Sequence, residues 1–265
     1  MTGHLSDDFV REAFHAAGEK RYALARLAYP HLLGPHWRWA IVGWAYIKCL
    51  DDLVDENASG QRAIETLHEH KEILERVYAG SPIDPGGSGH ASYGQRFCAW
   101  DRSCGSPLRA SMKEVLELME FDLQRRGEVL SREEIDQYLL RIGRVMIDFL
   151  FRFAAPGLML SEAFCKAASR AYLYADTLID LAHDIDFGLI NIPAEDLEQY
   201  PIRREAGFDA LRPWIAARAP DVERHFDDAI DLLRELPPLI RFWGRFFLTH
   251  KRKAFRRFLK DGHIG

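Results

Sequence analysis

Apolar side chains recur at spacings of three and four along most of the chain, which is the period of an α-helix. The alternation typical of β-strands is hard to find. Turn-forming residues divide the chain into predicted helices with approximate bounds 7–17, 21–33, 36–56, 62–78, 108–125, 132–153, 161–187, 194–198, 203–217, 219–235 and 238–260. Residues 80–94, rich in Gly, Pro and Ser, are predicted as a surface loop. We therefore predict an all-α protein in which residues 1–265 form a single domain, one bundle of helices around a central cavity.

One acidic pattern interrupts an otherwise apolar helical segment. Asp176, Asp180 and Asp184 are four residues apart, so on a helix their side chains share one face along about 12 Å. Like charges at this spacing destabilise an isolated helix, and the apolar residues between them predict a largely buried helix. Mg²⁺ would offset the negative charge, because it takes carboxylate oxygens together with substrate phosphates. A solvated acidic surface is the alternative interpretation.

A second acidic segment follows an apolar and aromatic helix nearer the N-terminus. Asp51 and Asp55 are four residues apart, and Lys48 and Trp44 precede them on the same face. Two acidic helices with metal between them predict a diphosphate site, with Lys48 at the diphosphate and Trp44 on an apolar tail or a carbocation. Ordinary core packing is the alternative for Trp44. Asp52 points to another side of the helix and is expected to cap, pair or support the site.

Composition and charge exclude some classes of protein. The chain has 265 residues, 48% of them hydrophobic, and a net charge of −5, so no global basic field favours nucleic acid. Its four cysteines form no CxxC pair and are expected to be thiols in a reducing compartment. No signal-peptide pattern or apolar run of about 20 residues is visible. We expect a cytoplasmic protein; a homodimer is compatible with the sequence, which leaves the oligomeric state open.

The two acidic segments resemble motifs of the squalene/phytoene synthase family. The first motif of that family, DDxxD, is similar to residues 51–55, with Lys48 at the preceding basic position. The second is similar to the Asp176, Asp180 and Asp184 series followed by Gly188 and a turn at residues 191–193. Residues 119–123 also resemble a family segment, and the likeness extends from about residue 20 to residue 260. The resemblance implies the isoprenoid synthase fold, Mg²⁺ bound by Asp51, Asp55, Asp176, Asp180 and Asp184, and an isoprenyl diphosphate substrate.

The chain also departs from the family pattern around the second motif. Apolar or differently shaped residues stand at positions where the family commonly has polar groups that serve head-to-head coupling, among them Leu140, Leu173 and Asn191. Squalene-synthase-like prenyltransferases of this kind transfer the prenyl group to an aromatic acceptor such as a carbazole. The departures therefore favour a Mg²⁺-dependent prenyltransferase acting on an isoprenyl diphosphate donor and an aromatic small-molecule acceptor, in secondary metabolism.

Further residues are candidates for binding and proton transfer. Arg141, Arg144 and Lys251, with Lys48, are candidate diphosphate ligands, although a structural ion pair is the alternative for each. An aromatic acceptor loses a proton after it attacks the cation, so a base is required. Asp148 and His183 are the candidates; Asp148 lies four residues after Arg144 in an apolar run and either pairs with that arginine or orients the acceptor.

Three other functions stay open at this point. The first is head-to-head condensation to a presqualene, squalene or phytoene type of product. The second is terpene cyclisation on the same fold. The third is a binding or assembly role without catalysis, against which the five retained carboxylates argue.

Overall fold

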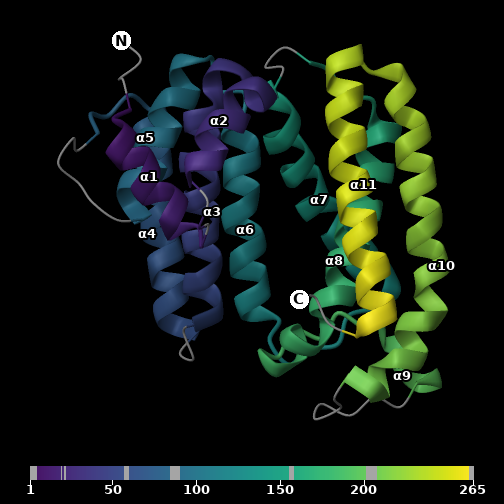
Figure 1. The fold of residues 1–265 in the computed structure, drawn as a ribbon. Helices are drawn as coiled ribbons and strands as arrows, with labels where there is room; N and C mark the ends of the chain where they lie inside the picture. Colours follow the sequence, from purple (N-terminus) through teal and green to yellow (C-terminus); the bar gives the residue numbers. More distant parts are fainter. Residues whose placement is uncertain are drawn as a thin grey trace. The chain divides into compact units, whose positions relative to one another are not determined.

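The computed structural model describes residues 5–18, 20, 22–56, 60–83, 90–154, 158–200 and 208–262. Its helices are α1 (Asp7–Ala16), α2 (Tyr22–Leu33), α3 (Trp37–Glu56), α4 (Gly60–Tyr78), α5 (His90–Ser103), α6 (Arg109–Gln124), α7 (Arg132–Ala154), α8 (Glu162–Asp186), α9 (Ala194–Gln199), α10 (Phe208–Leu232) and α11 (Pro238–Asp261). Short 3₁₀ turns, η1 (Gly34–His36) and η2 (Leu233–Glu235), precede α3 and α11. Within these described residues the only β-type pairing is one isolated bridge, between Val129 and Ile190. The prediction of an all-α protein is confirmed (Figure 1).

The chain forms two compact units. The first consists of Met1–Gln124 and Asp148–Leu158, and the second of Arg125–Ile147 and Met159–Gly265, so that α7 contributes residues to both. That the two units form one domain stays a prediction, and each unit is described by itself below.

In the first unit, α3 is the central helix and packs on α1, α5 and α6. Tyr46 and Leu50 of α3 are fully buried, as is Phe97 of α5. The two helices come close because glycines lie at their crossing: a Cβ on Gly43 would meet the Phe97 ring at 2.6 Å, and one on Gly94 would meet Tyr46 at 2.6 Å. The buried side of α3 is therefore fixed by this packing, which leaves its opposite side available for other roles.

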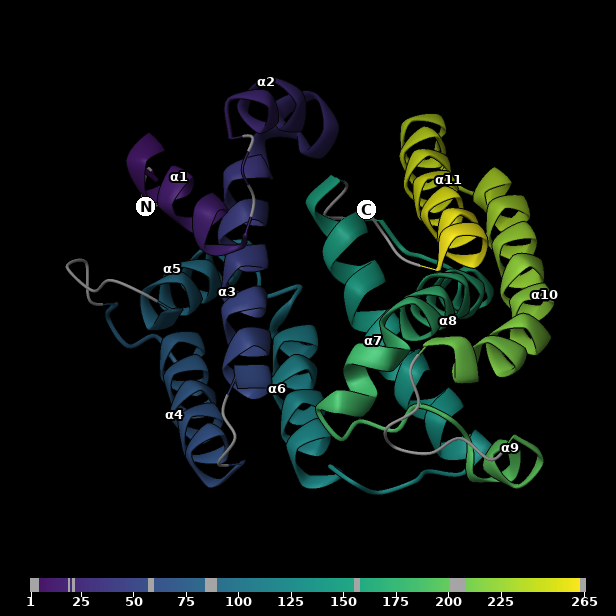
Figure 2. The ribbon, with the colours of Figure 1, turned by 60° about the horizontal axis from the view of Figure 1, so that its bottom comes forward.

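In the second unit, α8 packs along α10 and α11, which also contact each other (Figures 1 and 2). Phe164 of α8, Phe226 of α10 and Phe255 of α11 are fully buried in this unit. The first part of α7 comes very close to α8, because a Cβ on Gly143 would lie 2.3 Å from the Ser169 side chain. Buried contacts on several sides thus hold α8, the helix with the second acidic motif.

Two of the predicted elements are wrong. Helix α5 begins at His90, inside the stretch predicted as a surface loop. The prediction was wrong because the dense turn signals before His90 obscured the start of the helix. Residues 84–89 of that stretch lie outside the described residues. Helix α10 runs without a break through Pro213 and Pro220, whereas two shorter helices were predicted there. Proline weakens a helix locally, but packing of α10 along α8 and α11 offsets that cost.

None of the helices, over the residues that the structure describes, combines the length and the apolar character required to cross a lipid bilayer.

Candidate functional site

The first acidic motif lies on a solvent-accessible side of α3. Lys48 Nζ donates to Asp51 Oδ2 at 2.7 Å and lies 2.9 Å from Asp52 Oδ1, which confirms that Asp52 pairs. Burial by itself lowers the pKa of Lys48, but the hydrogen bonds and charges of the two aspartates outweigh it and raise that pKa above its usual value. The Asp51 side chain is 50% exposed and can reach a ligand. Asp55 belongs to α3, but its side chain lies outside the described residues.

Trp44 lies one turn before Lys48 on the same side of α3. Its side chain is 41% exposed, whereas its near neighbours Ala45 and Tyr46 are buried. Trp44 is therefore not part of the packed core of the first unit. Its predicted contact with a prenyl chain stays a prediction.

The second acidic motif occupies one face of α8. The apolar residues between the aspartates, such as Leu178, Leu181 and Ile185, are buried in the second unit. Asp180 is exposed, and Asp176 and Asp184 are half-buried. The helix thus buries its apolar side while its three carboxylates share the other face, as their spacing predicts.

Lys251 of α11 lies against this acidic face and forms an ion pair with Asp176. Its ammonium group also lies 4.7 Å from the centre of the Tyr172 ring, and that ring stacks on Phe247 of α11 at 4.9 Å. Burial lowers the pKa of Lys251 to about 8, while the neighbouring Asp176 carboxylate favours the charged ammonium form. Lys251, which was predicted as a diphosphate ligand, therefore lies next to the second motif. Tyr172, four residues before Asp176, was missed, although the same i,i+4 spacing indicates it.

A buried chain of hydrogen bonds holds the last aspartate of the motif. Gly188, with φ of 82°, ends α8 and lets the chain turn back. Asn191 Nδ2 then donates to Asp184 Oδ2 at 2.8 Å, and Arg125 donates to Asn191 Oδ1 at 2.9 Å. Arg125 is fully buried beneath the ring of Tyr138, 4.5 Å from its centre. Asn191, predicted as a substrate ligand, thus holds Asp184 through a hydrogen bond. Arg125 was not predicted, because no signal in the sequence pointed to it.

The remaining candidates lie in different surroundings. His183 is exposed on the acidic face of α8, with its ring 4.7 Å from that of Phe187. Leu173 is buried and Leu140 is half-buried. These three residues belong to the second unit.

The charged candidates on α7 have partners of their own. Arg144 pairs with Glu162 at 2.7 Å on the exposed surface, and Arg141 is exposed. Asp148, in the first unit, is largely buried, accepts a hydrogen bond from Ser111 at 3.0 Å and lies 3.7 Å from Arg152. The roles predicted for Arg141, Arg144 and Asp148 in a site stay predictions.

The donor groups on α3 and α8 suit Mg²⁺, because they are hard carboxylate oxygens on accessible faces. Among the described residues, no three His, Cys, Asp or Glu side chains converge on one point as in an all-protein metal site. Carboxylates one turn apart lie about 6 Å from each other along a helix. Each ion would thus take one or two carboxylates and complete its shell with diphosphate oxygens and water, the usual arrangement for Mg²⁺.

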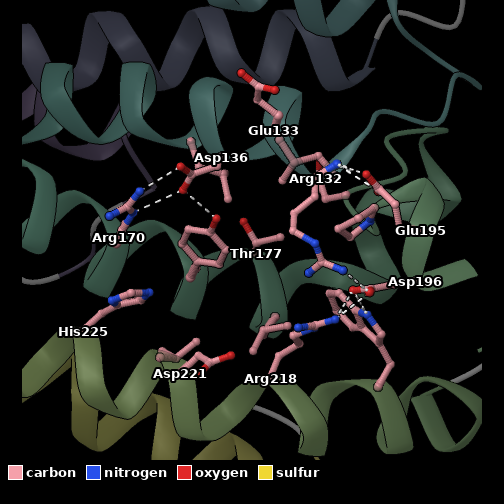
Figure 3. A pocket seen from close by; sticks show the side chains of 18 of the residues that line it. Arg132, Glu133, Asp136, Arg170, Thr177, Glu195, Asp196, Arg218, Asp221 and His225 are labelled. Carbon is pink, nitrogen blue, oxygen red and sulfur yellow. Dashed lines mark hydrogen bonds and ion pairs between the residues drawn. The ribbon is translucent and has the colours of Figure 1, made fainter. Parts of the chain in front are cut away.

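A cavity of about 600 Å³ lies on a different side of α8, entirely within the second unit (Figure 3). Arg170, Tyr174 and Leu178 of α8 line it. At about 100° per residue these positions point away from Asp176 and Asp180. These α8 side chains thus lie on another face than the carboxylates, although Asn191, which donates to Asp184, also lines the cavity.

The charges around this cavity neutralise one another. Asp136 accepts hydrogen bonds from Arg170 at 2.8 Å and from Tyr174 at 2.8 Å. Asp196, only 3% exposed, binds Arg132 at 2.6 Å and Arg218 at 2.5 Å (Figure 3). These pairs join α7, α8, α9 and α10, so we interpret them as structural contacts.

Comparison with known proteins shows which family and which fold this chain resembles. The family model described as squalene/phytoene synthase matches residues 19–258. The chain is similar in structure to squalene synthase HpnC from Alicyclobacillus acidocaldarius, with a TM-score of 0.65, 20% sequence identity and coverage of 97% of each chain. At that identity the likeness shows the fold alone, and it confirms the fold predicted from the motifs. No curated protein matches the sequence. The chain belongs to the squalene/phytoene synthase family.

Proposed function

We propose that this protein is a Mg²⁺-dependent prenyltransferase that ionises an allylic isoprenyl diphosphate and transfers the prenyl group to an aromatic acceptor. The family is one of prenyl-transferring enzymes that act on isoprenyl diphosphates and typically depend on a divalent metal. The observation that carries the proposal is the acidic face of α8, which keeps three carboxylates and a lysine beside apolar neighbours.

The acidic faces suit the binding and ionisation of a diphosphate. Bound Mg²⁺ would neutralise the charge that develops on the diphosphate as the C–O bond breaks. Asp51 and Asp180 are accessible ligands for it, and Asn191 keeps Asp184 in place. Lys48 and Lys251 already lie beside carboxylates, so they can also donate to diphosphate oxygens that join those carboxylates on the metal.

The surroundings of the second motif favour an acceptor with little charge. Leu173 of α8 and Leu140 of α7 are apolar, and Asn191 is occupied by Arg125 and Asp184. A flat aromatic ring needs an apolar slot with one or two polar anchors. A ring carbon attacks the allylic cation, a C–C bond forms, and the ring proton leaves to a base. We assign the base to His183, since it is exposed on the acidic face while Asp148 is engaged by Ser111 and Arg152.

Head-to-head condensation of two isoprenyl diphosphates is the second candidate. Membership of the squalene/phytoene synthase family and the likeness to a squalene synthase favour it. It requires the same ionisation step, but a second prenyl diphosphate takes the place of the aromatic ring.

One assay separates the two candidates. The protein is incubated with Mg²⁺ and dimethylallyl, geranyl or farnesyl diphosphate, with and without hydroxylated or nitrogen-containing tricyclic aromatics, and the products are identified by mass. We expect C-prenylated aromatics and no hydrocarbon from a single donor. Efficient formation of a C30 or C40 product from one prenyl diphosphate would contradict transfer to an aromatic acceptor and favour head-to-head condensation. If no diphosphate is released either with or without an aromatic acceptor, both candidate functions would be contradicted.

A further inference from the structure

One face of α11 carries large apolar side chains that are mostly exposed. Ile240, Leu248 and Phe255 form the buried side of this helix. Phe242 and Phe246, four residues apart, lie on the other side, with exposed fractions of 66% and 58%. Leu239 joins them at 63%. Exposed apolar groups that gather on one face mark an interaction surface more often than single ones do.

The same helix concentrates the positive charge of the protein. Eight of its residues are Lys or Arg and one is Asp, in a chain whose net charge is −5. Some of these cations are engaged inside the second unit: Arg241, Lys251, Arg252 and Arg256. Arg245, Lys253, Arg257 and Lys260 are exposed, and none of the four forms an ion pair with another residue of the described ranges.

Aromatic and basic side chains border one shallow groove on this helix. Its volume is about 230 Å³, and its walls are made by Phe242, Arg245, Phe246, Thr249, His250 and Lys253. The Phe246 and His250 rings stack at a centroid distance of 6.3 Å. Apolar and cationic groups are thus interleaved on one surface, rather than separated on two sides of the helix.

We propose that this face of α11 binds the surface of a lipid bilayer that contains anionic phospholipids. A basic helix with aromatic side chains on its accessible face is typical of an interfacial helix, whose apolar groups enter the boundary between headgroups and acyl chains. Phe242 and Phe246 supply those groups. Arg245, Lys253 and Arg257 lie at the level of the lipid phosphates, to which their charge is complementary.

Charge complementarity selects this occupant over a protein. Arg245, Lys253, Arg257 and Lys260, which form no ion pair within the described ranges, are spread along several turns of α11. An anionic leaflet presents an extended negative surface that can face all four of them. A second copy of this chain would bring the same positive face and be repelled.

Vesicle binding tests the proposal with the full chain. Vesicles of phosphatidylcholine alone, or with roughly one third phosphatidylserine, are sedimented with the protein, and the bound fraction is measured at low and high NaCl. We expect binding to the anionic vesicles only, weakened by salt. Failure to bind anionic vesicles at low salt would overturn the proposal.

Matched variants separate the apolar from the electrostatic contribution. Phe242→Ala/Phe246→Ala should weaken binding to anionic vesicles by about tenfold or more. Leu24→Ala/Leu27→Ala removes another exposed apolar pair, on α2, and should leave binding unchanged.

The electrostatic contribution is tested by Arg245→Gln/Lys253→Gln/Arg257→Gln, which should weaken binding by about a hundredfold and flatten its salt dependence. The control is Arg62→Gln/Arg76→Gln/Arg212→Gln, which removes the same charge elsewhere and should leave binding unchanged.

These variants change exposed side chains, and an unchanged circular dichroism spectrum and melting temperature verify that each is folded. Equal binding by the α11 variants and their controls would contradict the proposal. So would lipid-free dimerisation, seen by light scattering and lost in Phe242→Ala/Phe246→Ala, because it would assign the face to a second copy of the chain.

Discussion

At the scale of single residues, Asn191 joins a buried cation to a candidate metal ligand. Its two amide atoms do different things: the oxygen accepts from Arg125, and the nitrogen donates to Asp184. Metal ligands held in this way lose affinity for the metal when the supporting hydrogen bond is removed. We therefore expect the side chain to contribute to stability and to metal binding through separate atoms.

Two substitutions separate these contributions. Asn191→Leu removes both bonds and should lower the free energy of unfolding by about 1–3 kcal/mol, because it leaves the buried Arg125 without this acceptor. It should also raise the Mg²⁺ concentration for half-maximal activity by about tenfold or more. Asn191→Asp keeps an acceptor for Arg125 but replaces the donor to Asp184 by a like charge, so it should disturb Asp184 and the Mg²⁺ requirement more than it disturbs Arg125.

The measurements are denaturant unfolding and activity over a Mg²⁺ titration. An unchanged Mg²⁺ requirement in both variants would show that Asn191 supports the fold only.

At the scale of an element, α3 has one side for packing and one accessible side that carries the predicted site residues. Tyr46 and Leu50 are buried against the first unit, while Trp44 and Lys48 lie on the accessible side. Substitutions on the two sides should therefore affect different properties.

Trp44→Ala should cost less stability than truncation of a core residue, since 41% of the side chain is already in solvent. It should also shift the preference toward longer prenyl donors by enlarging the space for the prenyl chain. Tyr46→Ala is the matched control and should cost about 3–5 kcal/mol. The measurements are thermal unfolding and initial rates with dimethylallyl, geranyl and farnesyl diphosphate. A donor preference that does not move would remove Trp44 from the site.

Helices α7 and α10 both donate to Asp196 of α9, through Arg132 and through Trp214 and Arg218. Burial raises the pKa of Asp196, but Trp214, Arg132 and Arg218 outweigh burial and hold it below its usual value. A carboxyl group with a lowered pKa in the folded state stabilises the protein above its unfolded pKa of about 3.9, and this contribution is lost as the pH falls through the lower folded value.

Asp196→Asn should therefore cost about 1–3 kcal/mol at pH 7, because it weakens the hydrogen bonds that Arg132, Trp214 and Arg218 donate to a buried carboxylate, and the difference from the wild type should shrink below about pH 4. Asp221→Asn, which removes a carboxylate from an exposed pair with Arg224, should cost about 1 kcal/mol or less. Denaturant unfolding at several pH values measures both. A penalty for Asp196→Asn that does not depend on pH would contradict this role.

At the scale of the whole molecule, the proposed reaction requires the acidic motifs of both units to act on one diphosphate. Asp51 belongs to the first unit and Asp180 to the second. Groups that act together on one substrate show non-additive effects when they are changed together. Kinetics can therefore test whether the two motifs form a single site.

Asp51→Asn and Asp180→Asn should each lower kcat by on the order of a hundredfold or more, because each removes a metal ligand charge, with little loss of stability from these accessible positions. The double variant should be no worse than the poorer single variant. Single-turnover rates at saturating Mg²⁺ provide the measurement. Losses that multiply in the double variant would mean that the motifs act independently, and near-normal rates in either single variant would remove that aspartate from the site.

The sequence alone determined the features that depend on local spacing. The helical period predicted nearly all of the helices, because burial of one face requires apolar groups every three or four residues. The same period placed Asp176, Asp180 and Asp184 on one face of α8, and Lys48 beside Asp51 on α3. The family was predicted from the resemblance of these two segments to its motifs, and the family model confirms it.

Only the tertiary structure decided which distant segments meet these faces. Lys251 was a candidate from its charge, but packing of α11 on α8 brings it to Asp176. Arg125 meets Asn191 because the Gly188 turn returns the chain to the end of α8. Packing also carries α10 through its two prolines and leaves Phe242 of α11 exposed. A local pattern states that a face will be apolar or charged, whereas its partner depends on the packing energy of the whole unit, which no single segment encodes.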